Sequence, residues 1–325
     1  MTRKPSAQRR RAVVMGGAGF LGSHVCDALL DRDYDVVCLD NESTGSDTNV
    51  AHLVGDDRFA YRRCDVVDTF EVSGTVDLVL QLASPASPVH YLAMPVETMK
   101  VGSLGTMHGL DLAARHDARF VLASTSEVYG DPLEHPQRES YWGNVNPVGP
   151  RAVYDESKRF GEALTTAYRT SRALDTGIVR IFNTYGPRMA TDDGRVVPTF
   201  LHQALAGEPL TVAGDGLQTR SLCYVDDTVR GIVTMAESAH TGPVNIGNTH
   251  EVTMLELAKH VVELTGSSST IEFVERPVDD PEKRRPDTAL ARELLDWVPQ
   301  VDARTGLSRT IAWFSEALEA RSVGA

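Results

Sequence analysis

A tyrosine and a lysine four residues apart carry the clearest chemical signal in the sequence. Tyr154 and Lys158 are the ends of the segment Tyr-Asp-Glu-Ser-Lys. On a helix, residues four apart lie on the same face, one turn from each other. A lysine ammonium placed there favours the phenolate, so we expect it to lower the tyrosine pKa from its usual value of about 10. The pair predicts removal of a hydroxyl proton while a nicotinamide cofactor accepts the hydrogen.

Hydroxyl and carboxyl side chains follow an apolar run upstream of this pair. The run 119–123 is predicted as a strand, and Thr125, Ser126 and Glu127 come directly after it. Ligands of open α/β sheets bind at the carboxyl ends of the strands. We therefore expect Thr125 to hydrogen-bond a reacting hydroxyl. Glu127 is a carboxylate that could act as an acid or a base, or orient a water molecule.

A glycine-rich turn indicates which cofactor is used. Gly16, Gly19 and Gly22 lie between the apolar run 11–15 and a stretch with helical spacing of apolar residues. Glycines let the backbone approach a pyrophosphate, and the following helix offers free N–H groups. Asp40 ends the second predicted strand, where an acid accepts ribose hydroxyls and repels the extra phosphate of NADP. The sequence therefore predicts NAD.

The elements that must position these residues alternate along the first half of the chain. Strands are predicted at 11–15, 35–40, 61–64, 76–82, 119–123 and 176–182, and helices after residue 20, at 95–115 and at 153–172. Such alternation predicts an α/β fold with a Rossmann-type, doubly wound parallel sheet. After residue 182 short apolar pieces are separated by Gly and Pro, which predicts a smaller C-terminal α/β substrate lobe.

These patterns divide the chain into four parts. Residues 11–182 are predicted to form the NAD-binding domain. Residues 183–318 are predicted to be mainly the substrate lobe, with segments that return to the Rossmann domain. Residues 1–10 are interpreted as a disordered basic leader and 319–325 as a flexible tail.

Composition excludes several classes of partner. The 325 residues carry a net charge of −13, which argues against nucleic acid and requires local arginines for an anionic substrate. No apolar run approaches the ~20 residues that span a membrane, and the basic N-terminus lacks the apolar region of a secretory signal. The four cysteines form no CxxC pair and are interpreted as free thiols in a reducing cytoplasm. No metal site is expected.

A series of longer motifs resembles a known family. In chain order, the motifs include GGAGFLGSH, LASPASP, STSEVYGDP, YWGNVNPVGPRAVYDESKR, RIFNTYGPRM and DDPEKRRPD. They resemble the extended short-chain dehydrogenases of the NAD-dependent epimerase/dehydratase family, from about residue 12 to about residue 315. Within that family they most resemble the members that decarboxylate UDP-glucuronate to UDP-xylose.

The resemblance implies a reaction in which NAD is regenerated. The sugar C4 is oxidised to a UDP-4-keto intermediate, CO₂ leaves from the resulting β-keto acid, and the hydrogen returns to C4. It implies that Tyr154 is the base, with Lys158 as its electrostatic partner and a ligand of the NAD ribose. Arg284 matches an arginine that binds the sugar carboxylate, a task that suits a guanidinium fork. The catalytic set implied is Thr125, Ser126, Glu127, Tyr154, Lys158 and Arg284.

The glycine turn and the resemblance together assign the two ligand sides. The cofactor side is Gly16, Gly19, Phe20, Leu21, Gly22, Asp40, Asn41, Ser43, Thr44, Gly45, Asp65, Val66, Leu82, Ser84, Tyr154 and Lys158. The UDP-sugar side is Pro85, Lys100, Glu127, Asn183, Arg195, Val197, Thr211, Val212, Arg220 and Arg284. The resemblance also implies a homodimer that pairs the helices at 95–115 and 153–172 into a four-helix bundle. Many members of the family carry an N-terminal membrane anchor, and this sequence departs from them, so we expect a cytoplasmic form.

Three other functions would also use a dinucleotide-binding fold of this kind. A dehydratase of this family places an Asp immediately before the Glu of the motif, where this sequence has Ser126, a poor proton donor. A UDP-glucuronate 4-epimerase shares the substrate and the first oxidation, and the Thr-Ser-Glu and Lys-Arg-Arg-Pro segments argue against it. A non-catalytic dinucleotide-binding module would not need Tyr154, Lys158, Thr125 and Glu127 together.

Overall fold

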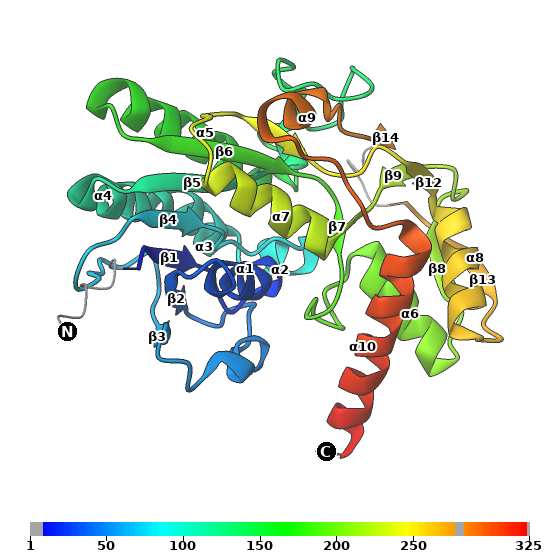
Figure 1. Cartoon of the computed structure of the whole chain (residues 1–325). Helices are drawn as coiled ribbons and strands as arrows, with labels where there is room; N and C mark the ends of the chain where they lie inside the picture. Colours follow the sequence, from blue (N-terminus) through cyan, green and yellow to red (C-terminus); the bar gives the residue numbers. More distant parts are fainter. Residues whose placement is uncertain (1–8, 277–282, 324–325) are drawn as a thin grey trace.

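A seven-stranded parallel sheet forms the centre of the chain in this computed structural model, which describes residues 9–276 and 283–323 (Figure 1). In spatial order its strands are β11 (Val244–Ile246), β6 (Thr176–Ile181), β5 (Arg119–Thr125), β4 (Leu78–Gln81), β1 (Arg11–Met15), β2 (Asp35–Asp40) and β3 (Phe59–Arg63). The order reverses between β1 and β4, the place where doubly wound sheets bind ligands. This confirms the predicted fold class.

Helices cover both faces of the sheet (Figure 1). One face carries α1 (Phe20–Leu30) and α7 (Val225–Ala236), and the other carries α3 (Pro95–Lys100), α4 (Thr106–His116) and α5 (Ala152–Arg172). Because both faces are covered, β5 is buried along its whole length, as expected for a parallel sheet. The two faces correspond to two separate apolar cores.

The helix predicted at 95–115 is interrupted. A π-helical segment, η3 (Val101–Gly105), separates α3 from α4. Gly102 lies against α5 so closely that an added Cβ would be 2.6 Å from the Ser157 Cβ. Close approach of α5, which bears Tyr154, therefore requires glycine at this point, and a local π-bulge accommodates the contact.

A second lobe is built from the later part of the chain and lies beside the sheet (Figure 1). Its helices are α6 (Val196–Ala206), α8 (Met254–Thr265) and α10 (Ala303–Val323). Its strand pairs are β8 (Leu210–Ala213) with β13 (Ile271–Val274), β9 (Thr219–Ser221) with both β12 (Glu251–Thr253) and β14 (Lys283–Arg284), and β7 (Thr184–Tyr185) with β10 (Cys223–Tyr224). Through α7 and β11 the later sequence also completes the main sheet.

Short elements connect these parts. They are the helices α2 (Pro88–Ala93) and α9 (Ala289–Leu295) and the 3₁₀ turns η1 (Asp47–Asn49), η2 (Ala51–Leu53) and η4 (Ser126–Tyr129). The turn η4 follows β5 directly and carries Ser126 and Glu127. Thr125 begins this turn, because its hydroxyl oxygen accepts the Glu127 N–H at 3.3 Å.

The chain ends differ from the prediction where they are described. α10 continues to Val323, so the predicted flexible tail is helical up to that residue, in keeping with the Ala, Leu and Glu of its sequence. Residues 1–8 of the predicted leader and residues 324–325 lie outside the described residues. Arg10 is described and pairs with Glu237 at 3.1 Å.

The cysteines and the helices bear on two further predictions. All four cysteines are free thiols, as predicted, and Cys26, Cys38 and Cys223 are buried. None of the helices in the described ranges 9–276 and 283–323 is long and apolar enough to cross a bilayer.

Candidate active site

One cavity of about 1500 Å³ runs along the carboxyl ends of the strands and under the second lobe. Its wall contains every residue predicted for the cofactor side and every residue of the predicted catalytic set. It also contains Pro85, Lys100, Asn183, Arg195, Val197, Thr211 and Arg220 from the predicted substrate side. The two ligand sides therefore form one continuous site.

One predicted substrate residue does not face the cavity. The side chain of Val212 is fully buried in the apolar core, while its neighbours Thr211 and Ala213 line the cavity. Successive side chains of a strand point to opposite faces, so β8 can present only alternate residues to a ligand. The prediction of a ligand contact for the Val212 side chain is wrong for this reason.

The glycine turn lies between β1 and α1. Gly16 has a φ of +78°, and a Cβ on Gly22 would be 2.0 Å from the Gly16 carbonyl oxygen, so both positions require glycine. Gly19 is the N-cap of α1, and its first turn has neither a side-chain cap nor an acidic residue. The start of α1 therefore has no side-chain cap of its own, which suits the binding of an anion at the helix N-terminus.

Asp40 is fixed beside this turn. One carboxylate oxygen accepts the Ala18 N–H at 2.9 Å, and the other accepts the Glu42 N–H at 2.8 Å. Burial raises the pKa of Asp40, although these N–H donors oppose the shift. Each oxygen keeps a lone pair for a ribose hydroxyl. Further along the wall, the Ser84 hydroxyl is buried with no partner among the described residues, as expected where a ligand completes the hydrogen bonding. The residues present therefore fit NAD.

Tyr154 and Lys158 face the cavity from α5. The Lys158 ammonium donates to the Ala123 carbonyl oxygen at 2.9 Å and lies 5.8 Å from the centre of the Tyr154 ring. Burial lowers the pKa of Lys158 to about 8. Burial also raises the pKa of Tyr154 to about 12, although its hydrogen bond with Thr125 acts in the opposite direction. The predicted lowering of the Tyr154 pKa is therefore wrong for the chain alone, because loss of water outweighs the nearby hydroxyl and cations.

Glu127 is held by two arginines. Both Nη atoms of Arg284 donate to its carboxylate, one of them at 3.0 Å, and Arg151 Nη2 donates at 2.7 Å. Burial alone would raise the pKa of Glu127, but the charges of Arg284 and Arg151 outweigh it and bring the pKa to about 2. Glu127 is thus a carboxylate at neutral pH. This excludes it as a proton donor in the free protein and leaves the predicted role of orienting a group.

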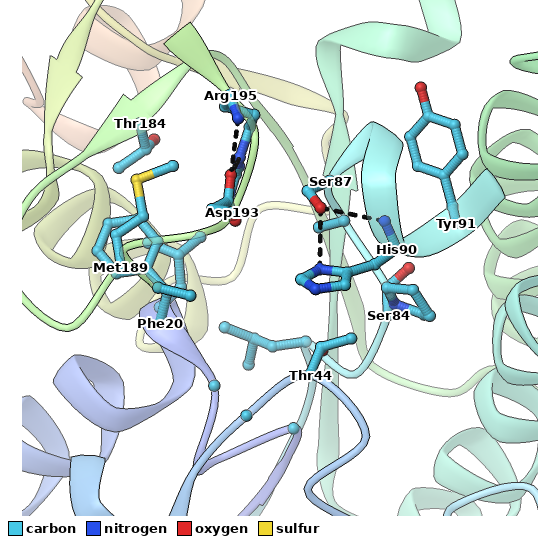
Figure 2. A pocket seen from close by; sticks show the side chains of 18 of the residues that line it. Phe20, Thr44, Ser84, Ser87, His90, Tyr91, Thr184, Met189, Asp193 and Arg195 are labelled. Atoms are coloured by element: carbon cyan, nitrogen blue, oxygen red, sulfur yellow. Dashed lines mark hydrogen bonds and ion pairs between the residues drawn. The ribbon is translucent and has the colours of Figure 1, made fainter. Parts of the chain in front are cut away.

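Two further arginines of the wall lie toward the second lobe. Arg195 pairs with Asp193, at 2.5 Å for Nε and 2.9 Å for Nη2 (Figure 2). In that view the pair lies near Thr184, on the opposite side of the cavity from Ser87 and His90. Arg220 is buried in β9, where Nη1 donates to the Thr219 carbonyl oxygen at 2.9 Å. Arg195 and Arg220 thus place two guanidinium groups at the cavity, and that of Arg195 is already paired with a carboxylate.

Two of the wall residues that were not predicted from the sequence lie beside the catalytic set. Arg151 lies three residues before Tyr154, one helical turn away, and that spacing within the Gly-Pro-Arg segment was the available signal. Tyr91, from α2, stacks on Tyr154 with ring centres 5.2 Å apart and an angle of 8°. Stacking of this kind holds an aromatic ring in place. No sequence pattern connects two tyrosines so far apart.

Asp155 gives a prediction on stability. One of its carboxylate oxygens is buried with no partner among the described residues, and burial together with the charge of Glu127 raises its pKa to about 7. Its contribution to stability is therefore complete below about pH 4 and lost as the pH rises through 7. We expect Asp155→Asn to raise the Tm by about 2–4 °C or more at pH 8, and by much less at pH 5. Thermal unfolding at both pH values checks this, with Glu156→Gln as the control, and an equal change at both contradicts it.

Comparison with known proteins decides the family. Residues 12–247 match the model of the NAD dependent epimerase/dehydratase family. The chain belongs to this family. A UDP-glucuronic acid decarboxylase 1 from Arabidopsis thaliana is 52% identical over 307 residues, which cover 94% of this chain and 70% of that protein. The protein of the same name from Danio rerio is 48% identical and covers 96% of this chain and 74% of its own length.

A solved structure of the epimerase/dehydratase fold matches the whole architecture. The UDP-glucuronic acid 4-epimerase from Bacillus cereus, in complex with UDP-glucuronic acid and NAD, is 28% identical with a TM-score of 0.85. The match covers 94% of this chain and 99% of that one. NAD is thus the cofactor of this chain, as the glycine turn and Asp40 predicted.

Proposed function

We propose that this chain decarboxylates UDP-glucuronate to UDP-xylose through a UDP-4-keto intermediate, with NAD regenerated in each turnover. The observation that supports it best is Arg284, whose buried guanidinium lines the same cavity as Tyr154 and already holds a carboxylate, that of Glu127. An arginine fork binds a carboxylate with two parallel hydrogen bonds. The similarity to UDP-glucuronic acid decarboxylases at 52% and 48% identity supports the same substrate.

Oxidation at C4 makes the later loss of CO₂ easy. Tyr154 takes the proton of the C4 hydroxyl as a phenolate, with Thr125 bonded to its oxygen and Lys158 one turn away. The positive charge of NAD⁺, when bound, would lower the Tyr154 pKa from the value of about 12 that burial gives it in the chain alone. NAD, when bound, accepts a hydrogen with two electrons from C4 and returns it at the end. In the 4-keto sugar the carboxylate is β to the ketone, so the C5–carboxylate bond breaks with its electron pair moving into the carbonyl. A proton then adds at C5.

Arg284, Ser126 and Glu127 handle the carboxylate side of the sugar. Arg284 binds the carboxylate, and Ser126 follows Thr125 on the wall of the cavity. With a pKa of about 2, Glu127 is ionised, so it orders the water that protonates C5 and does not supply the proton itself. Arg151 stays bonded to Glu127 while Arg284 contacts the sugar, so the carboxylate of Glu127 is never without a cation.

The remaining residues bind the rest of the two ligands. We assign the UDP moiety and the sugar ring to Pro85, Lys100, Asn183, Arg195, Val197, Thr211 and Arg220. We assign NAD to Gly16, Gly19, Phe20, Leu21, Gly22, Asp40, Asn41, Ser43, Thr44, Gly45, Asp65, Val66, Leu82 and Ser84, together with Tyr154 and Lys158. Their common place on the wall of one cavity supports their assignment to a single site for both ligands.

Product analysis tests the proposal against its nearest alternative. UDP-glucuronate with catalytic NAD⁺ should yield UDP-xylose and CO₂. A 4-epimerase, the activity named for the solved Bacillus cereus structure, would give UDP-galacturonate without CO₂, and that product would contradict the proposal. Dehydration is disfavoured because Ser126 occupies the position of the dehydratase acid.

We also propose that the protein is a cytoplasmic homodimer formed through α3 and α5. Large apolar side chains are exposed on α3, on η3 and on α5, namely Val96, Met99, Leu104 and Phe160. Pairing these helices with a second copy would bury that surface in a four-helix bundle. We expect a dimer by analytical ultracentrifugation and a shift toward monomer in Phe160→Glu. A wild-type monomer at micromolar concentration would contradict this proposal. The four free thiols support a reducing compartment.

A further inference from the structure

Gln137 is a buried polar residue that holds the chain segment bearing Arg284. Its side-chain oxygen accepts the backbone N–H of Arg285 at 2.9 Å, and the backbone N–H of Gln137 donates to the Arg285 carbonyl oxygen at 2.9 Å. Its carbonyl oxygen accepts the Asp287 N–H at 2.8 Å. Gln137 is fully buried and is not among the described residues that line the cavity. Any effect it has on the reaction must therefore pass through the groups that it contacts, and three of its hydrogen bonds go to this segment.

On the side away from Gln137, the segment that bears Arg284 is attached through a short strand. Arg284 belongs to β14, which contains only Lys283 and Arg284 and pairs with β9 at Thr219 and Arg220. Two residues make a shorter strand than the three to ten usual in proteins, so this pairing alone holds the backbone weakly. The three hydrogen bonds to Gln137 follow Arg284 immediately and complete its attachment.

Gln137 itself is fixed in place. Its side-chain NH₂ donates to the Glu134 carbonyl oxygen at 2.7 Å. The Asn245 side chain donates both to the Gln137 carbonyl oxygen at 3.0 Å and to the Asp287 carbonyl oxygen at 3.1 Å. Asn245 follows the first residue of β11 in the main sheet, so the network ties the segment to the rigid part of the fold. A buried network with its polar groups satisfied is rigid.

We propose that Gln137 is a positioning residue that fixes the backbone around Arg284 and so aims the guanidinium at Glu127 and at the carboxylate of the substrate. The proposal rests on the function proposed above, because it assigns the sugar carboxylate to Arg284. A bidentate pair needs both N–H donors aligned with both oxygens, so a small shift of the backbone weakens it. Ligands without a carboxylate do not depend on this alignment.

Binding of two nucleotide sugars by the full-length Tyr154→Phe protein with NAD tests the proposal, because this background does not turn UDP-glucuronate over during the measurement. Gln137→Met keeps the length of the side chain and removes its acceptor and donor. We expect its Kd for UDP-glucuronate, measured by calorimetry, to rise about tenfold, and its Kd for UDP-glucose to stay unchanged. Gln137→Glu keeps an acceptor oxygen for the Arg285 N–H and should retain most of the preference. Thr310→Val removes a buried hydrogen bond of 2.7 Å in α10 and is the matched structural control.

A double-mutant cycle separates positioning from loss of stability. In the Arg284→Ala background, Gln137→Met should cause no further loss of UDP-glucuronate binding, since the group that it positions is gone. Equal losses for the two sugars, or an additive loss in the Arg284→Ala background, would overturn the proposal. If Gln137→Met does not fold, Gln137→Glu decides, and a loss of preference as large as that of Arg284→Ala overturns it. Failure of the wild type to form UDP-xylose contradicts the proposed function alone, because the binding cycle does not depend on turnover.

Discussion

Tyr154→Phe lowers kcat for UDP-glucuronate by about 10³-fold or more and leaves NAD bound. The substitution removes only the phenolic oxygen, so the ring keeps its stacking on Tyr91, with centres 5.2 Å apart. Without that oxygen the two side chains beside it are poor replacements for the base, because the Thr125 hydroxyl is a much weaker base than a phenolate and Lys158 donates to a backbone carbonyl. Loss of the first oxidation stops every later step.

Two measurements make the Tyr154 result specific. Tyr168→Phe on the same helix removes a hydroxyl that donates to Asp111 at 2.7 Å, and Tyr168 does not line the cavity, so we expect nearly wild-type kcat. Bound NAD is measured by its release on denaturation, and the Tm reports folding. A Tyr154→Phe variant that retains wild-type rates would show that another group is the base.

Arg284→Ala lowers kcat/KM for UDP-glucuronate by about 10²-fold or more, with little effect on the binding of UDP-glucose. An arginine fork to a carboxylate is a charge-assisted, bidentate contact, and its loss removes a buried cation from beside the sugar carboxylate. The pKa of Glu127 should also rise, because Arg284 is the larger of the two charges that lower it to about 2. Since a raised carboxyl pKa means protonation at higher pH, the acid side of the pH–rate profile should move upward.

Arg285 supplies the matched control. It is the next residue of the same segment, it pairs with Glu251 at 3.2 Å, and it is absent from the described cavity wall. We expect Arg285→Ala to keep the preference for UDP-glucuronate. If Arg284→Ala weakens the binding of UDP-glucose and of UDP-glucuronate equally, Arg284 does not recognise the carboxylate, and the role proposed for it above is wrong.

Six of the seven strands of the sheet were predictable because each is a local pattern, whereas β11 was not predicted as a strand. The boundaries of β1 and β2 coincide with the predicted 11–15 and 35–40, since each is a buried apolar run next to a turn residue. The break at η3 was not predictable, because it follows from the contact of Gly102 with Ser157 on another helix. Likewise, only the pleat of β8 in the folded lobe decides that Thr211 faces the cavity and Val212 does not.

The sequence indicated which residues line the cavity, but it did not indicate their pKa values. Tyr154, Lys158 and Thr125 belong to recognisable segments and do lie together. Their pKa values depend on burial, which no spacing reports, and this is why the expected direction for Tyr154 was wrong. The charge state of Glu127 depends on Arg284, which is 157 residues away in the sequence and arrives through β14.

That separation has an evolutionary consequence. The parts that carry out redox chemistry lie in the first half of the polypeptide, whereas the arginine that would decide the fate of the oxidised sugar is delivered by a two-residue strand near the end. Substitutions in this short segment can change the product that is formed without disturbing the oxidation step. A change of product within such a fold therefore needs few substitutions, provided that Gln137 beside the segment is retained.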